Sequence, residues 1–110
     1  MYTILNTGLE PEVIKKVRSI LKSYPEVKRA ILFGSRAKGN FKPFSDIDMT
    51  LVGDDLNLSI QQKIENELDD LLLPNKFDIS LYHQIKNSEL IDHIDRVGKT
   101  LYDLSNPIID

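Results

Sequence analysis

The residues best suited to chemistry in this 110-residue chain stand in one short region, between Gly34 and Asp48. An apolar segment ends at Gly34-Ser35, where glycine lets the backbone approach a ligand and a following short helix would offer free N–H groups to phosphate oxygens. After ten intervening residues, Asp46 and Asp48 stand two apart at the start of another apolar segment. In a strand this spacing points both carboxylates to one face. Phosphate is therefore the expected ligand of the glycine-serine motif.

The Asp46-x-Asp48 pair predicts a divalent-metal face. Two carboxylates a few ångströms apart repel by roughly 3 kcal/mol at an effective dielectric constant near 20. A fold that holds them together normally neutralises them with a cation, and their oxygen ligands suit Mg²⁺. A third acid, Asp78, lies in a later apolar segment, and we expect it to join the pair.

Hydrophobic periodicity predicts three long helices around this region. Apolar residues at steps of three and four predict a core-facing helix that begins at Pro11 and ends before Pro25. Ser59 with Gln62 three residues later is typical of a capping box and predicts the start of a second helix. Ser88 is the expected cap of the last helix.

Strands are predicted at 28–33, 46–52 and 77–82, with a short edge strand at 99–102. Because Ser35 follows the first strand and Asp46 opens the second, these two strands must run antiparallel to bring both residues together. The strand-helix-strand unit that follows favours a right-handed crossover and parallel pairing, which places Asp78 beside the paired acids. The expected fold class is α/β, with a small mixed β-sheet packed with helices.

Composition limits the function. A chain of this length predicts one domain over residues 1–110, with little room for a nucleic-acid-binding module. The net charge of −3 and a pI near 5.3 argue against a broad basic footprint, so we expect no stable nucleic-acid binding. The chain has no cysteine, no apolar run of membrane-span length and no basic-then-apolar leader at residues 1–4, which predicts a cytoplasmic protein without a membrane partner.

The motif Gly34-Ser35, ten residues, then Asp46-x-Asp48 resembles the signature of the nucleotidyltransferase superfamily that includes DNA polymerase beta. The longer string Leu32-Phe33-Gly34-Ser35-Arg36-Ala37-Lys38-Gly39, followed by Ser45-Asp46-Ile47-Asp48, resembles the minimal nucleotidyltransferases (MNT). These small proteins are typically antitoxins paired with a HEPN-domain toxin in prokaryotes, and the similarity extends over most of the chain.

This resemblance implies a polymerase beta-like fold and attack by an acceptor hydroxyl on the α-phosphorus of ATP, with pyrophosphate as the leaving group. The expected catalytic and metal-binding residues, for two Mg²⁺ ions, are Asp46, Asp48 and Asp78. The expected nucleotide-binding residues are Gly34, Ser35, Arg36 and Lys38. The implied activity is transfer of AMP to a hydroxyl, with tyrosine the expected acceptor, on a cognate HEPN toxin, which neutralises the toxin.

Two other functions stay open at this point: a nucleotidyltransferase acting on a small-molecule hydroxyl, and a non-catalytic module that neutralises its partner by binding. Arg36 could equally serve as a surface ion-pair partner. Phe41 and Phe44 are expected to pack as a loop over the core, with the wall of the nucleotide pocket as the alternative. His83 and His93 stand apart from any second metal-type cluster, so we expect neither to act at the site.

Overall fold

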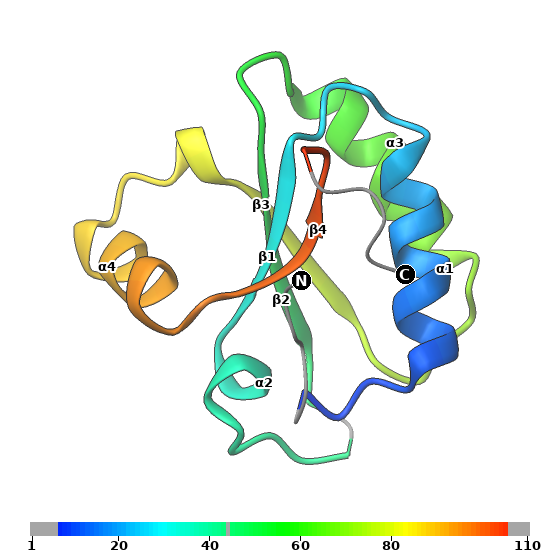
Figure 1. Cartoon of the computed structure of the whole chain (residues 1–110), viewed down its shortest axis with the longest axis vertical. Helices are drawn as coiled ribbons and strands as arrows, with labels where there is room; N and C mark the ends of the chain where they lie inside the picture. Colours follow the sequence, from blue (N-terminus) through cyan, green and yellow to red (C-terminus); the bar gives the residue numbers. More distant parts are fainter. Residues whose placement is uncertain (1–6, 44, 106–110) are drawn as a thin grey trace.

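The computed structural model of the chain describes residues 7–43 and 45–105. Figure 1 shows the elements, and in chain order they are α1 (Pro11–Lys22), β1 (Arg29–Phe33), α2 (Ser35–Lys38), β2 (Ile47–Val52), α3 (Leu58–Asp69), β3 (Phe77–Leu81), the 3₁₀ helix η1 (Tyr82–Gln84), α4 (Ser88–Val97) and β4 (Lys99–Asp103). The expected leader-free start at residues 1–4 lies outside the described residues. Within the described ranges, no helix is long and apolar enough to cross a membrane.

The four strands form one mixed sheet in the order β3-β2-β1-β4. β1 pairs antiparallel with β2 and with β4, while β2 and β3 are parallel. The α/β class, the mixed sheet and both predicted strand directions are therefore confirmed. The strand limits differ by one residue from the prediction at several ends, as at Asp46, which directly precedes β2.

One face of the sheet packs against α1 and α3, and the other face carries polar residues. Figure 1 shows α1 and α3 together on one side and α4 on the other. Alternation along β2 sends Ile47, Met49 and Leu51 into the core, where all three are fully buried. On the covered side they belong to the same cluster as Leu21 of α1 and Ile64 of α3. Each such buried aliphatic side chain stabilises the fold by about 1.5–3 kcal/mol. This burial fixes the orientation of β2, so the alternate residues of the strand face the candidate site.

Both helix starts predicted from serine are wrong by one or two residues. Asn57 caps α3, because its side-chain carbonyl accepts a hydrogen bond from the Ile60 N–H. Asn87 likewise caps α4 and accepts from the N–H groups of Glu89 and Leu90. Asparagine and serine are comparable caps, so the sequence alone did not separate the neighbouring candidates.

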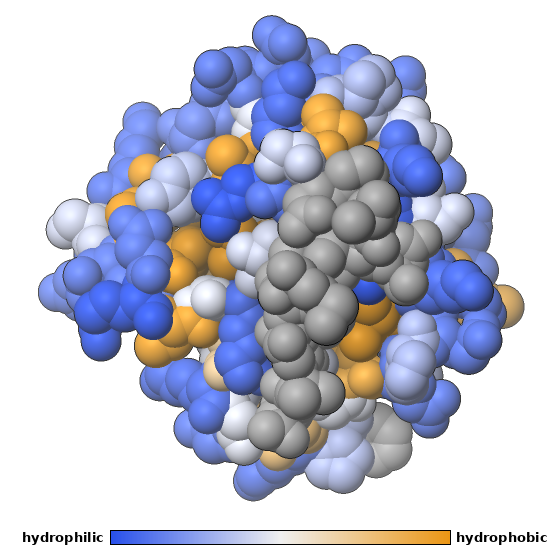
Figure 2. Space-filling view, in the orientation of Figure 1, coloured by the Kyte–Doolittle hydropathy of each residue, from blue (hydrophilic) through white to orange (hydrophobic). Residues whose placement is uncertain are grey.

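Figure 2 shows that the face of Figure 1 is mostly hydrophilic, with smaller hydrophobic areas between α4 and the sheet. The exposed large apolar side chains of the described residues are Leu58, Leu72 and Leu104. Scattered apolar side chains of this kind are ordinary on a protein surface.

Candidate active site

The turn between β1 and α2 depends on a glycine, because any other residue at this position would displace a neighbouring side chain. Gly34 has φ +74° and ψ −151°, a conformation that L side chains rarely adopt. A Cβ atom built on it would lie 2.3 Å from Oδ2 of Asp48. Ser35 then begins α2, whose first-turn N–H groups have no acceptor within the helix. The turn therefore brings backbone donors and the Ser35 hydroxyl close to a carboxylate.

The strand register gathers the predicted acids at the same end of the sheet. Phe33, the last residue of β1, is opposite Asp48 on β2, and Asp48 is opposite Asp78 on β3. Asp46 stands two residues before Asp48, at the entry to β2. The glycine, the serine and the three aspartates thus come from the antiparallel pair β1 and β2, with the turn between them, and from β3, the parallel neighbour of β2. The predicted strand directions require this arrangement.

The pKa of Asp48 reflects its burial and its carboxylate neighbours. Asp48 is partly buried, whereas Asp46 and Asp78 are exposed. Burial raises the pKa of the Asp48 carboxyl above its usual value, and the charges of Asp78 and then Asp46 raise it further. A positive charge on His93 would act in the opposite direction and lower this pKa. A cation beside Asp48 would relieve the crowding of negative charge.

Among the described residues, no three carboxylate or imidazole groups converge closely enough to ligate one metal ion. The donor chemistry nevertheless fits Mg²⁺, since every candidate ligand is a carboxylate oxygen. Asp46 and Asp78 are exposed and their side chains can turn by rotation about χ1. Coordination by Asp46, Asp48 and Asp78 therefore stays a prediction.

Arg36 is placed differently from either role considered for it. It is 2% exposed, and its guanidinium donates to the backbone carbonyls of Thr7 (Nη1, 2.8 Å), Ser45 (Nη2, 3.0 Å) and Pro43 (Nη2, 3.5 Å). The ring of Phe41 lies under it, 5.2 Å from Cζ to the ring centroid. Burial lowers the pKa of Arg36 from its usual value. A guanidinium held this way ties the loop to α2 and does not face a phosphate or a surface acid.

The loop held by Arg36 is the one that presents Asp46. The side-chain amide of Asn75 donates to the carbonyl of Pro43 at 3.0 Å and to that of Ser45 at 3.2 Å. The two carbonyls are thus shared by Arg36 and Asn75, directly before Asp46. The sequence analysis did not identify this role of Asn75.

The remaining predicted residues fall on the surface or in the loop. Lys38 is the last residue of α2 and is exposed, so its ammonium group is free to approach a ligand. Phe41 packs against Arg36, in agreement with the packing interpretation. Phe44 lies outside the described residues. His83 is exposed on η1, which follows the end of β3, whereas Asp78 lies near the start of that strand.

His93 is the residue of this region that the sequence did not reveal. Its Nε2 accepts a hydrogen bond of 3.0 Å from the Gly34 N–H, although 59 positions separate the two residues. No spacing rule connects a helix position to a distant strand end, so only the packing of α4 could show it.

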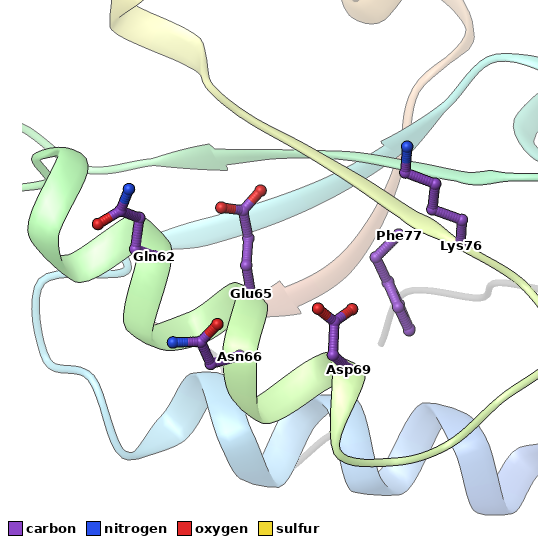
Figure 3. Close-up of a pocket in the computed structure, with 6 residues that line it drawn as sticks. All are labelled: Gln62, Glu65, Asn66, Asp69, Lys76 and Phe77. Carbon is purple, nitrogen blue, oxygen red and sulfur yellow. The ribbon is translucent and has the colours of Figure 1, made fainter.

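A cleft of about 370 Å³ lies elsewhere, between α3 and the start of β3. Figure 3 shows its residues, with the carboxylates of Glu65 and Asp69 pointing from α3 toward β3; the lining is Gln62, Glu65, Asn66, Asp69, Lys76 and Phe77. Phe77 and Asp78 are neighbours in a strand and so point to opposite faces. The cleft is therefore separate from the carboxylates and contains none of the predicted site residues.

A glycine-serine turn facing paired acids at one end of a mixed sheet defines a nucleotidyltransferase fold. The chain belongs to the family Polymerase beta, Nucleotidyltransferase, which matches residues 15–106. No match was found among curated proteins.

Solved structures give the same fold. A toxin-antitoxin structure with AMP-PNP is 22% identical, with a TM-score of 0.68 over 86% of this chain and 77% of that one. A chain in the structure of the tri-AMPylated Shewanella oneidensis HEPN toxin in complex with MNT antitoxin is 19% identical, with a TM-score of 0.66 over 89% of this chain and 76% of that one. The toxin-antitoxin MntA-HepT gives 19% identity and 0.64 over 88% and 75%. The predicted superfamily is thus confirmed by the family match, and the solved MNT antitoxin structure shares the fold of this chain.

Proposed function

We propose that the chain is an antitoxin-type protein adenylyltransferase that transfers AMP from ATP to a hydroxyl, expected to be a tyrosine, of a HEPN-domain toxin. One observation carries the proposal: the register that sets Asp48 between Phe33 and Asp78 brings the glycine-serine turn and three acids to one end of the sheet. Solved relatives of the same fold include an MNT antitoxin with an AMPylated HEPN toxin. A small catalytic core suffices when the substrate is a protein that supplies its own docking surface.

In the proposed reaction, the first-turn N–H groups of α2 and the Ser35 hydroxyl hold the terminal phosphates, with Lys38 as a further positive charge. The acceptor oxygen attacks the α-phosphorus, the bond to the β-phosphate oxygen breaks, and pyrophosphate leaves. In this proposal Asp78 also accepts the hydroxyl proton. Asp46, Asp48 and Asp78 would hold two Mg²⁺ ions, which neutralise the triphosphate and lower the pKa of the acceptor hydroxyl. Arg36 positions Asp46 through the loop and is not assigned to phosphate.

The experiment is incubation of the chain with α-labelled ATP, Mg²⁺ and a candidate HEPN-domain protein. We expect label on the protein, and none with Asp46→Asn or Asp48→Asn, because these acids serve the metal ions and not the core. The matched control is Asp54→Asn, the same charge change in the turn after the opposite end of β2, where Asp54 is exposed. It should transfer at the wild-type rate.

Other outcomes of this experiment would support one of the two alternative functions. Neutralisation of the partner without incorporated label would indicate the non-catalytic binding module, and label on an aminoglycoside-like small-molecule hydroxyl would indicate the second transferase class. Retained transfer by both aspartate variants would contradict the two-metal assignment. A single minimal domain over residues 1–110 and a cytoplasmic location are parts of the same proposal.

A further inference from the structure

The hydrogen bond between Gly34 and His93 joins the phosphate-binding turn to helix α4. The Gly34 N–H donates to Nε2 of His93 at 3.0 Å. The same imidazole meets the ring of Phe33 edge-on, with centroids 6.2 Å apart and planes at 79°. Since Nε2 accepts, the ring proton of the neutral imidazole is on Nδ1. The turn thus has a partner from outside its own strand and helix.

Three residues at the C-terminal end of α4 anchor the helix in the orientation that this bond requires. Ile94 is 2% exposed. Asp95 accepts a hydrogen bond of 2.9 Å from the Tyr82 hydroxyl through Oδ1. At Gly98 the chain comes so close to the sheet that a Cβ would lie 2.6 Å from Cγ2 of Ile31. Because successive helix residues point about 100° apart, burial of Ile94 directs His93 and Asp95 to opposite sides.

The turn itself needs such a partner. Gly34 has no Cβ to restrict its backbone, and glycine populates positive and negative φ almost equally. Its carbonyl accepts a hydrogen bond of 3.1 Å from the Lys38 N–H, so α2 holds the peptide that follows the glycine. Without an acceptor for the Gly34 N–H, the peptide between Phe33 and Gly34 would rotate among several orientations relative to α2. Only one of them points the Ser35 hydroxyl and the first-turn N–H groups of α2 as the structure has them.

We propose that His93 is a positioning residue that fixes the Gly34-Ser35 turn for the triphosphate by accepting the Gly34 N–H. This inference rests on the proposed function, since it assigns the turn to ATP. His93 acts through the backbone of the turn and touches neither the reacting atoms nor the acceptor. Its loss therefore weakens nucleotide binding and leaves the turnover of bound ATP nearly unchanged.

The test compares three variants in the intact chain. His93→Phe removes the acceptor and keeps an aromatic ring against Phe33, whereas His93→Gln offers an amide oxygen near the position of Nε2. Tyr82→Phe is the matched control, because it removes the other hydrogen bond that anchors α4. The measurements are the Kd of a non-hydrolysable ATP analogue with Mg²⁺ by calorimetry, the exchange rate of the Gly34 amide by NMR without nucleotide, and KM and kcat for transfer.

For His93→Phe we expect the Kd and the KM for ATP to rise about two- to tenfold, the range of one net hydrogen bond, with kcat within twofold of wild type. The Gly34 amide should exchange faster. His93→Gln should restore affinity and protection to within about twofold of wild type, and Tyr82→Phe should leave both unchanged.

Three results would overturn the inference: wild-type affinity in His93→Phe, no rescue by His93→Gln, or an equal loss in Tyr82→Phe, which would make the effect one of α4 docking. These differ from failure of the proposed function. A wild-type chain that binds no ATP analogue would refute the nucleotide site itself, and the inference with it.

Discussion

Gly34 and Asp48 are in such close contact that a single added methyl group would collide with the carboxylate, at 2.3 Å from Oδ2. The turn that is expected to bind phosphate and the acid that is expected to bind metal are therefore packed against each other. A change in the backbone of either residue moves both.

Gly34→Ala should consequently destroy the site. Both the positive φ of Gly34 and the collision oppose the new Cβ. We expect a loss of about 1–3 kcal/mol in the free energy of unfolding and at least a tenfold loss in affinity for Mg²⁺ and an ATP analogue. Urea unfolding and calorimetry measure the two. Gly39→Ala is the matched control, since Gly39 has φ +86° with nothing within 4 Å of the new Cβ. It should lose stability but keep its affinity, and an equal loss of affinity there would contradict the role of the collision.

Ser35→Ala removes one hydroxyl at the start of α2 and leaves the backbone donors in place. A hydrogen bond to a charged phosphate contributes roughly 1.5–3 kcal/mol, so we expect the KM for ATP to rise about ten- to a hundredfold. The measurement is the ATP dependence of the transfer rate. Ser19→Ala, an exposed position on α1, serves as the control and should behave as wild type. An unchanged KM in Ser35→Ala would remove Ser35 from the site.

Arg36→Lys separates the structural role found for Arg36 from the phosphate contact expected from the sequence. A lysine cannot donate at once to the carbonyls of Thr7, Pro43 and Ser45, and unpaired buried carbonyls are unfavourable. We expect a loss of about 1–3 kcal/mol in stability by urea unfolding, together with weaker binding caused by the displaced loop. Full stability combined with a weak affinity for ATP would instead show that Arg36 serves the phosphates.

Much of the site was predictable because its residues obey short-range rules. The spacing of Ser35, Asp46 and Asp48, with the strand alternation, required an antiparallel pair, and the crossover length required Asp78 in a parallel neighbour. These requirements depend on backbone geometry alone. The structure reproduces them in its register.

The partners of these residues were not predictable, because they depend on tertiary packing. Arg36 was expected at a phosphate from the resemblance to nucleotidyltransferases, because its guanidinium offers several charged donors. Its burial follows from carbonyls contributed by Thr7 and the loop before Asp46. His93 reaches Gly34 only because Ile94 is buried against the sheet. No pattern in the sequence encodes either contact.

The last prediction concerns the pH dependence of stability without metal, which follows from the raised pKa of Asp48. Burial and the charges of Asp78 and Asp46 make the ionised carboxylate less favourable in the folded chain than in the unfolded chain. The native state therefore binds this proton more tightly. The contribution to stability is fully present below the unfolded pKa, near 3.9, and is lost as the pH rises through the raised folded value.

Asp48→Asn removes this loss. At neutral pH in the presence of EDTA we expect the variant to be more stable than wild type by on the order of 1 kcal/mol after solvent screening, a rise of roughly 4 °C in Tm. The difference should shrink as the pH falls through the raised pKa of Asp48 and be absent below about 4. Asp54→Asn should show no such gain. The stabilisation of wild type by Mg²⁺ with an ATP analogue should largely disappear in Asp48→Asn, because ligand stabilisation follows affinity for the folded state. A variant less stable than wild type would show that the Asp48 carboxylate stabilises the fold, and an undiminished ligand shift would place the metal away from Asp48.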